Sequence, residues 1–259
     1  MVDNINMNIK LCIPSYKRPF ILSSSTLNVI KDLGLPIYVF LKDMEEYRAY
    51  TADPYSNYHS SLNIKYVITG TSGIGQKRNF IRHYFPIGEK IVMLDDDINE
   101  IKQKDNDDFN LKNFLEEMFL TMEREETKFA GICLYDNTYF MKDGYSTKLK
   151  YCGGCLMAEI IRENKIITPL DQFEDFYYSL KCFEKDKKII RFNNIYVKTK
   201  YYNPSGGICD AMGGLENRKK ICEQVSKDLV ALYPKAMSRY LKKDGIWNIR
   251  LNHRFIAVS

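Results

Sequence analysis

Three consecutive carboxylates, Asp95-Asp96-Asp97, are the residues of this chain best suited to chemistry. They directly follow an apolar run at residues 90–94, which is typical of a buried strand, and open α/β sheets bind ligands at the carboxyl ends of their strands. Three adjacent negative charges repel one another, and a divalent cation such as Mg²⁺ or Mn²⁺ would supply the missing counter-charge. In extended backbone Asp95 and Asp97 point one way and Asp96 the other. We therefore expect Asp97 to ligate a metal and Asp95 to bind the metal or a ribose. The alternative is an acidic turn that caps the next element.

Strand and helix signals alternate over the first hundred residues and would position this triplet. Apolar runs predict strands at residues 9–13, 37–41, 64–68 and 90–94. Helical patterns predict one helix at residues 26–33, ended by Gly34, and another at residues 76–84 after a glycine-rich turn. This alternation favours an α/β fold in which a mixed, mostly parallel sheet is flanked by helices on both faces.

The second half of the chain is less regular. Apolar spacing predicts a helix over residues 111–122, and further helices are expected at residues 171–183 and 217–233, the last ended by Pro234. Strands are expected at residues 129–134, 155–160 and 189–197. The length suits a single α/β domain with a helical C-terminal extension.

The composition is that of an ordinary globular protein of 259 residues, 45% of them apolar and 27% charged. No apolar stretch approaches the about 20 residues needed to cross a bilayer, and no signal-peptide pattern is present, so we expect a cytoplasmic protein with reduced thiols. Cys152-Gly153-Gly154-Cys155 lacks the second cysteine pair of a zinc site, and buried thiols are the better interpretation. The net charge of +5 permits a polyanionic partner without requiring one, although basic residues gather late, at residues 181–191, 218–220 and 239–243.

Four motifs, in order over roughly residues 8–183, together resemble the glycosyltransferases with the GT-A fold, a Rossmann-like α/β fold. Pro14-Ser15-Tyr16-Lys17-Arg18-Pro19 looks like their first nucleotide loop, and the glycine turn that runs from Gly73 to Asn79 looks like their second. The aspartate triplet matches their Asp-any-Asp signature, and Glu174-Asp175 matches the acidic pair that often holds the catalytic base of inverting members. The resemblance implies one GT-A-type domain, with a nucleotide-sugar-binding half at about residues 8–100 and an acceptor-binding half with the C-terminal helix at residues 101–259.

A narrower resemblance covers nearly the whole chain. Gly-Ile-Gly-Gln-Lys-Arg, Leu-Asp-Asp-Asp, Glu-Asp and then Pro204-Ser205-Gly206-Gly207 before a final helix are similar to the TET/JBP-associated glycosyltransferases. These include the base J glucosyltransferase and relatives in phages and giant viruses, which are thought to glycosylate hydroxylated pyrimidines in DNA. The resemblance implies a UDP-sugar donor, UDP-glucose first, a divalent metal, and a hydroxymethylated pyrimidine in DNA as the acceptor. For a phage or viral protein, the site of action would be the host cytoplasm.

Donor binding gives the first motifs their expected roles. A metal held by Asp97 would stabilise the negative charge that develops on the leaving diphosphate, with Asp95 and Asp96 in the same nucleotide-sugar site. Lys77 and Arg78, with Gly75 and Gln76 in the same turn, could contact phosphate or base, or they could form an exposed basic helix turn. Pro14, Ser15, Tyr16 and Arg18 would cradle the nucleoside, with Tyr16 near the uracil ring, or would be a plain strand-ending turn. Asp43 either reaches the base or starts a helix.

The acceptor hydroxyl must lose a proton as it attacks the sugar. Asp175 is the first choice for the base and Glu174 the second, although both would also suit the first turn of a helix, where they stabilise its dipole. Asp171 suits the N-cap better than catalysis. Gly153 and Gly154 would let a sugar or acceptor approach the backbone, or would form a bulge. His253 could fold back as a further metal ligand, as happens in some GT-A enzymes.

The sequence thus predicts a metal-dependent inverting glycosyltransferase. One alternative is an enzyme of the same fold acting on a saccharide, lipid-linked or protein acceptor, which predicts no affinity for DNA. A second is a nucleotidyltransferase, which does not explain Glu174-Asp175. A third is a non-catalytic binding module, which would not need these charges. The oligomeric state is not readable from the sequence.

Overall fold

The computed structural model describes residues 8–52, 54–134, 137–199 and 206–257. Pro204 and Ser205, which belong to the expected Pro-Ser-Gly-Gly segment, lie outside these residues. No helix in the described ranges combines the length and the apolar character that crossing a bilayer requires.

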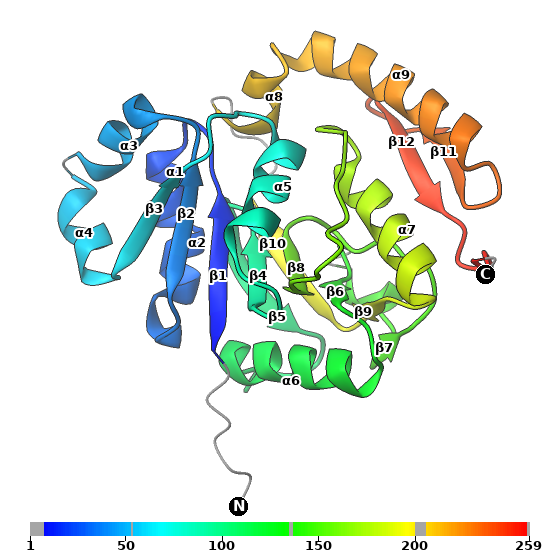
Figure 1. Cartoon of the computed structure of the whole chain (residues 1–259), viewed down its shortest axis with the longest axis horizontal. Helices are drawn as coiled ribbons and strands as arrows, with labels where there is room; N and C mark the ends of the chain where they lie inside the picture. Colours follow the sequence, from blue (N-terminus) through cyan, green and yellow to red (C-terminus); the bar gives the residue numbers. More distant parts are fainter. Residues whose placement is uncertain (1–7, 53, 135–136, 200–205, 258–259) are drawn as a thin grey trace, which may run out of the picture.

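An eight-stranded mixed sheet forms the centre of the molecule, in the order β3-β2-β1-β4-β8-β6-β9-β7 (Figure 1). Four parallel strands make its first half: β1 (Ile9–Pro14), β2 (Ile37–Leu41), β3 (Ile64–Ile68) and β4 (Lys90–Leu94). The second half contains β8 (Leu156–Ile160), antiparallel to both its neighbours, then β6 (Phe129–Ile132), β9 (Ile190–Phe192) and the short edge strand β7 (Tyr145–Ser146). The expected mixed, mostly parallel sheet is confirmed.

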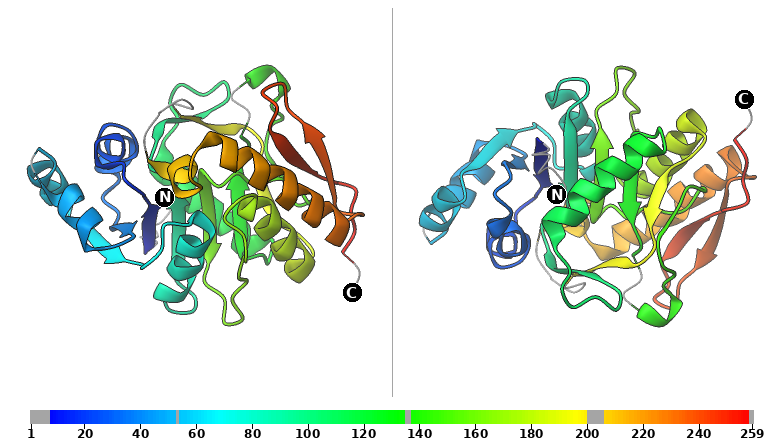
Figure 2. Two further views of the ribbon diagram at one scale, coloured as in Figure 1. Left: turned by 90° about the horizontal axis from the view of Figure 1, so that it is seen from above. Right: turned by 90° about the horizontal axis from the view of Figure 1, so that it is seen from below.

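Helices cover both faces of this sheet because the apolar side chains of its strands alternate between two cores. Leu11, Val39 and Val92 belong to the core that also contains side chains of α1 (Pro19–Ser24), α2 (Thr26–Ile30), α3 (Met44–Thr51) and α6 (Leu111–Arg124). Cys12 and Phe40 point to the other core, with α5 (Ile74–Tyr84), α7 (Glu174–Asp186) and α9 (Leu215–Leu232). The views of Figure 2 show α9 on the upper side of the molecule and α6 on the lower side.

Short helical segments complete the connections. Beyond β2 and α3 the chain forms α4 (Ser56–Ser61), and α2 continues into the 3-10 helix η1 (Lys31–Leu33), which ends at Gly34 with a left-handed φ of 66°. The expected stop at Gly34 is confirmed, because glycine adopts this conformation without the strain that a Cβ atom adds. The 3-10 helix η2 (Thr138–Phe140) and the short helix α8 (Gly207–Ala211) lie in the second half.

The strand expected at residues 189–197 is two strands instead. β9 stays in the main sheet, whereas β10 (Ile195–Thr199) leaves it after Asn193 and Asn194 and pairs antiparallel with β5 (Ile98–Gln103). β5 begins immediately after the aspartate triplet and was not expected from the sequence. The acidic turn therefore connects a strand of the main sheet to a strand of a second, two-stranded sheet.

The C-terminal extension contains the expected helix and, in addition, a hairpin that was not expected from the sequence. α9 confirms the expected last helix, and β11 (Met237–Leu241) then pairs with β12 (Trp247–Leu251). The turn of the hairpin contains Asp244-Gly245, with Gly245 at a φ of 78°, a dipeptide that favours hairpin turns. The hairpin packs against α9 and α7 (Figure 1), and the basic run at residues 239–243 lies on it.

Candidate active site

The aspartate triplet follows β4, at the edge of the sheet where the parallel strands end. Asp96 is buried and accepts a hydrogen bond of 2.5 Å from the Ser15 hydroxyl, which is also 2.6 Å from the hydroxyl of Tyr50. Asp95 and Asp97 are more open, with 36% and 24% of their side chains exposed. Asp96 therefore ties β4 to the loop after β1, while the carboxylates of Asp95 and Asp97 remain accessible to a ligand.

Arg18 supplies part of the counter-charge that the triplet requires. Its guanidinium lies 3.3 Å from Asp96 and 3.4 Å from Asp97. The chain brings a distant segment onto this loop, since Arg18 donates to the carbonyl of Gly206 at 3.3 Å and the Tyr16 carbonyl accepts from the Gly207 amide at 2.9 Å. A Cβ atom on Gly207 would lie 2.3 Å from the Arg18 guanidinium carbon, so glycine is required there for the segment before α8 to reach the loop.

Lys77 is almost fully buried beneath the loop after β1, so the interpretation of Lys77 as part of an exposed basic turn is wrong. Its ammonium donates to the Ser15 carbonyl and lies 4.0 Å from the carboxylate of Glu46. That carboxylate also accepts from the Lys17 amide at 2.8 Å, and burial lowers the pKa of Lys77 to about 8. The Tyr16 ring lies 5.4 Å from the Lys77 ammonium. Lys77 thus shapes the loop from Pro14 to Arg18 from below, and its ammonium is not free to contact a ligand.

Arg78 is equally buried and connects two of the expected acidic sites, so the exposed-turn interpretation is wrong for this residue also. It forms ion pairs with Glu174 and, at 3.0 Å, with Asp95, and it donates to the Gly154 carbonyl at 2.8 Å. A Cβ atom on Gly154 would lie 2.5 Å from the Arg78 guanidinium. The group that approaches the backbone of Gly154 is therefore Arg78, where a sugar or acceptor was expected.

The neighbouring Gly153 is packed against protein as well. A Cβ atom added there would lie 2.3 Å from the side chain of Leu134. Cys152 and Cys155 are buried free thiols, which confirms the better interpretation of Cys-Gly-Gly-Cys. Within the described ranges, no group of three or more His, Cys, Asp and Glu side chains has the arrangement of a metal site, so these cysteines belong to no zinc site there.

Asp171 caps a helix, as expected, but the helix is α5 rather than α7. Its carboxylate accepts from the Gly75 amide at 2.9 Å and the Gln76 amide at 3.3 Å, whereas the residue before α7 is Phe173, in a left-handed conformation. A Cβ atom on Gly75 would lie 1.8 Å from the carbonyl oxygen of Leu170. Gly75 and Asp171 therefore hold the segment before α7 against α5, and the exposed Gln76 side chain accepts from the Thr71 hydroxyl at 3.0 Å.

Glu174 and Asp175 begin α7 as expected, next to the triplet. Glu174 is buried, and burial together with Asp175 raises its pKa to about 8, against the opposing effect of Arg78. Asp175 is half-buried. Its carboxylate accepts hydrogen bonds from the Tyr151 hydroxyl, from the Gly154 amide at 3.2 Å and from the Phe176 amide at 2.9 Å. Burial raises its pKa as well, despite these hydrogen bonds. Of the two carboxylates, Asp175 is the more accessible to an acceptor.

Negative charge exceeds positive charge in this cluster. Two guanidiniums face five carboxylates, which leaves an excess of three negative charges when all of them are ionised: Arg18, Arg78, Asp95, Asp96, Asp97, Glu174 and Asp175. Burial, Asp95 and Asp96 raise the pKa of Asp97 to about 7, more than Arg18 lowers it. Asp95 and Asp97 fit a divalent cation, because Mg²⁺ is usually held by one or two carboxylates and takes its other ligands from phosphates and water.

Two of the expected ligand-binding residues lie elsewhere or act differently. His253 is exposed after β12, two residues before Phe255. The ring of Phe255 contacts Phe183, which lies nine residues after Glu174 on α7. At the rise of an α-helix this places Phe183 about 13.5 Å from Glu174 along the helix. We therefore drop His253 as a metal ligand. Asp43 caps α3, because its side chain accepts hydrogen bonds from the amides of Glu45 and Glu46, both at 3.0 Å. The interpretation of Asp43 as a helix start is therefore confirmed.

Three residues that support the cluster or the loop beside it were missed in the sequence: Glu46, Tyr50 and Tyr151. Tyr50 accepts from the Arg18 amide at 2.8 Å, and Tyr151 donates to Asp175. Only Tyr151 had a local signal, since it directly precedes the Cys-Gly-Gly-Cys segment. Glu46 and Tyr50 lie on α3, and nothing in their local sequence indicates a role beneath the loop after β1.

A solved structure shares this architecture. The mannosyltransferase PcManGT from Pyrobaculum calidifontis, in complex with GDP-Man and Mn²⁺, matches with a TM-score of 0.58 and 13% sequence identity over 88% of this chain and 64% of that chain. The expected GT-A fold is confirmed. This chain spans somewhat less than two thirds of the length of that mannosyltransferase. No protein-family model matches the chain, and no curated protein sequence matches it either.

Two further structures have TM-scores below 0.5. GalNAc-T7 with UDP, GalNAc and Mn²⁺ has a TM-score of 0.48 and 11% identity, over 77% of this chain and 45% of that chain. UDP-glucose pyrophosphorylase complexed with UDP-glucose has a TM-score of 0.42 and 12% identity, over 85% of this chain and 98% of that chain.

Proposed function

We propose that the chain is a metal-dependent, inverting glycosyltransferase that moves a sugar from a UDP-sugar, UDP-glucose first, to a hydroxymethylated pyrimidine in DNA. The observation that carries this proposal is the acidic cluster at the carboxyl edge of β4. There Asp95 and Asp97 remain partly exposed beside Asp175, although Asp175 lies on a segment far from the triplet in the chain. A site of this kind can hold a diphosphate through a metal on one side and deprotonate an acceptor on the other.

Asp97 and Asp95 are the proposed metal ligands. A divalent cation bound there would act as a Lewis acid toward the leaving diphosphate, and the excess negative charge of the cluster favours its binding. Arg18 holds Asp97 in position at 3.4 Å, and Tyr16, half-buried on the same loop, is a candidate to contact the nucleobase. The structurally similar mannosyltransferase is described with GDP-Man and Mn²⁺, which supports a nucleotide-sugar donor and a divalent metal.

Asp175 is the proposed base that takes the proton from the acceptor hydroxyl. Its pKa is raised by burial, which brings the carboxylate closer to the range in which general bases work at neutral pH. Tyr151 and the Gly154 amide orient the carboxylate through hydrogen bonds to Oδ2. Glu174 is the second choice because it is buried and paired with Arg78.

The acceptor proposal rests on the resemblance to the TET/JBP-associated glycosyltransferases and on the late basic residues. DNA would have to present the base hydroxyl in the major groove or flip the nucleotide out of the duplex. Such an enzyme of a phage or virus would act in the host cytoplasm.

Two measurements test the proposal. Isothermal titration of UDP with and without Mn²⁺ should give metal-dependent binding that Asp97→Asn abolishes, and unchanged binding in that variant contradicts the metal assignment. Radiolabelled UDP-glucose should label DNA that contains hydroxymethylcytosine but not the same unmodified DNA. Label on a glycan or protein together with none on the modified DNA would contradict the DNA acceptor.

A further inference from the structure

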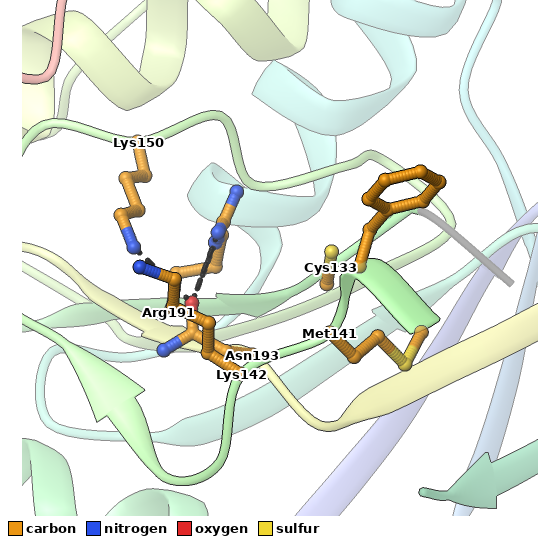
Figure 3. Close-up of a pocket in the computed structure, with 7 residues that line it drawn as sticks. Cys133, Met141, Lys142, Lys150, Arg191 and Asn193 are labelled. Atoms are coloured by element: carbon orange, nitrogen blue, oxygen red, sulfur yellow. Dashed lines mark hydrogen bonds between the residues drawn. The ribbon is translucent and has the colours of Figure 1, made fainter. Parts of the chain in front are cut away.

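A pocket of about 350 Å³ lies beside the ends of β6 and β9, and its polar lining is basic (Figure 3). Lys142, Lys150 and Arg191 supply three cationic side chains, and the buried Asn193 lies between two of them. The Asn193 side-chain oxygen accepts from Arg191 at 2.9 Å and from Lys150 at 3.4 Å, so a single neutral group orients both cations. Figure 3 shows these side chains converging on one side of the pocket, with Cys133 and Met141 on the other.

None of these three cations forms an ion pair with a carboxylate of the described residues. Asp143 is nearby in sequence, but it lies 3.9 Å from the ammonium of Lys104 instead. Burial, followed by repulsion from Arg191 and Lys142, lowers the pKa of Lys150. Lys150 and Arg191 are half-buried and Lys142 is exposed at their side. Positive charges that lie close together and lack carboxylate partners are suited to binding an anion.

Exposed aromatic rings lie at the rim of the same pocket. Phe140 lines it and is 71% exposed, and the adjacent Tyr139 on η2 is 86% exposed. The two rings are 5.1 Å apart and perpendicular, so each offers a free face. A cationic pocket beside exposed aromatic faces is the arrangement that binds single-stranded nucleic acid, in which the cations hold the backbone phosphate and the rings stack on bases. A phosphorylated sugar or lipid headgroup would use the cations and leave both rings unused.

The position of the pocket in the sheet relates it to the proposed active site. Cys133 follows β6 and Asn193 follows β9, and both strands run in the same direction as β4 because β8 is antiparallel to β4 and β6. At about 4.8 Å per strand, the ends of β6 and β9 lie about 10 and 15 Å from the end of β4. Lys150 also directly precedes Tyr151, which donates to Asp175. The pocket is therefore on the Asp175 side of the acidic cluster, next to strands that end about 10 and 15 Å from the end of β4.

We propose that Lys142, Lys150, Arg191 and Phe140 form a subsite for single-stranded or flipped-out nucleic acid, with a backbone phosphate in the pocket and a base stacked on the aromatic rim. The subsite positions the strand that carries the acceptor base at Asp175. This role as an acceptor subsite rests on the proposed function, whereas the binding of nucleic acid does not.

The test measures the binding of a fluorescent oligothymidylate by anisotropy over a range of salt concentrations. Lys150→Gln combined with Arg191→Gln should weaken binding at least about tenfold and reduce the salt slope by about 0.7 for each phosphate that the protein no longer neutralises. Phe140→Ala should weaken binding on the order of tenfold with an unchanged salt slope. The matched control is Lys148→Gln, which removes an exposed charge of the same segment outside the pocket and should change the affinity less than about twofold.

Three outcomes overturn the subsite: wild-type affinity in the double variant, equal weakening by Lys148→Gln, or displacement of the oligonucleotide by glucose 6-phosphate at equal concentration. A methylphosphonate strand carries no backbone charge. Its affinity for the wild-type protein should be no higher than the affinity of the natural strand for the double variant. Metal-dependent UDP binding, measured on the same variants, should be unchanged. If UDP binds but the oligonucleotide does not, the subsite is refuted and donor binding stands. If the oligonucleotide binds through the pocket but UDP does not bind, the proposed function is refuted and the subsite stands.

Discussion

Replacing Arg78 tests whether this buried guanidinium holds the acidic cluster together. Arg78→Met leaves the side-chain volume similar but removes the charge that pairs with both Asp95 and Glu174, along with the hydrogen bond to Gly154. Above pH 8, where Glu174 is ionised, removing one partner of this buried ion pair costs about 3–5 kcal/mol, because the remaining charge is left buried without compensation. For a domain of this size each kcal/mol lowers the melting temperature by about 2–4 °C, so a decrease of roughly 6–20 °C is expected.

Urea denaturation followed by circular dichroism measures this cost, with Arg48→Met as the matched control. Arg48 is exposed on α3, and its replacement should change the free energy of unfolding by no more than about 0.5 kcal/mol. The double variant Arg78→Met, Glu174→Gln should recover part of the loss, since the neutral amide needs no counter-charge. If Arg78→Met is no less stable than Arg48→Met at equal m-values, the reasoning about the cluster is refuted.

Three further predictions concern residues around the same cluster. Glu174→Gln should make the pH dependence of stability shallower. The folded protein keeps a proton on Glu174 up to about pH 8, whereas the unfolded chain releases it near pH 4.3, so stability should fall more steeply between these values in the wild type than in the variant, in which the raised pKa values of Asp97 and Asp175 still act. The midpoints of urea unfolding, measured across this pH range, test the prediction. An equal change of midpoint with pH in the wild type and in the variant would contradict it. Asp171→Ala should lower the free energy of unfolding by about 0.5–2 kcal/mol, because it removes the cap of α5. The control is Asp228→Ala on the exposed face of α9, and an equally small loss of stability in the two variants would argue against the cap. The rate of sugar transfer should rise with pH through the raised pKa of Asp175, because the base acts only when ionised, and Asp175→Asn should lower kcat by about 10²–10⁴ and abolish that limb. A retained limb in the variant would assign the base elsewhere.

Local sequence determined the elements that build the sheet and the position of the triplet within them. The apolar runs that lead to Pro14 and to Asp95 are buried strands in the structure, and the helix stop at Gly34 follows from its left-handed conformation. These features depend on side-chain pattern and backbone sterics over a few residues, which a sequence displays directly. The hairpin at Gly245 had a comparable turn signal in Asp244-Gly245, but its strands are only partly buried and have no clear apolar run.

Contacts between distant segments decided what the polar residues do. Arg78 is a basic residue in a helical turn when the sequence is read locally, but α5 packs so that its guanidinium lies between Asp95 and Glu174. In the same way, Asp171 caps α5 although α7 is the helix next to it in the chain. Such pairings depend on the order of strands in the sheet and on which helix covers which face, and no local pattern encodes that order. The sequence by itself therefore determined that carboxylates lie at the end of a buried strand. Only the tertiary structure decided which cations neutralise them and which carboxylates stay accessible.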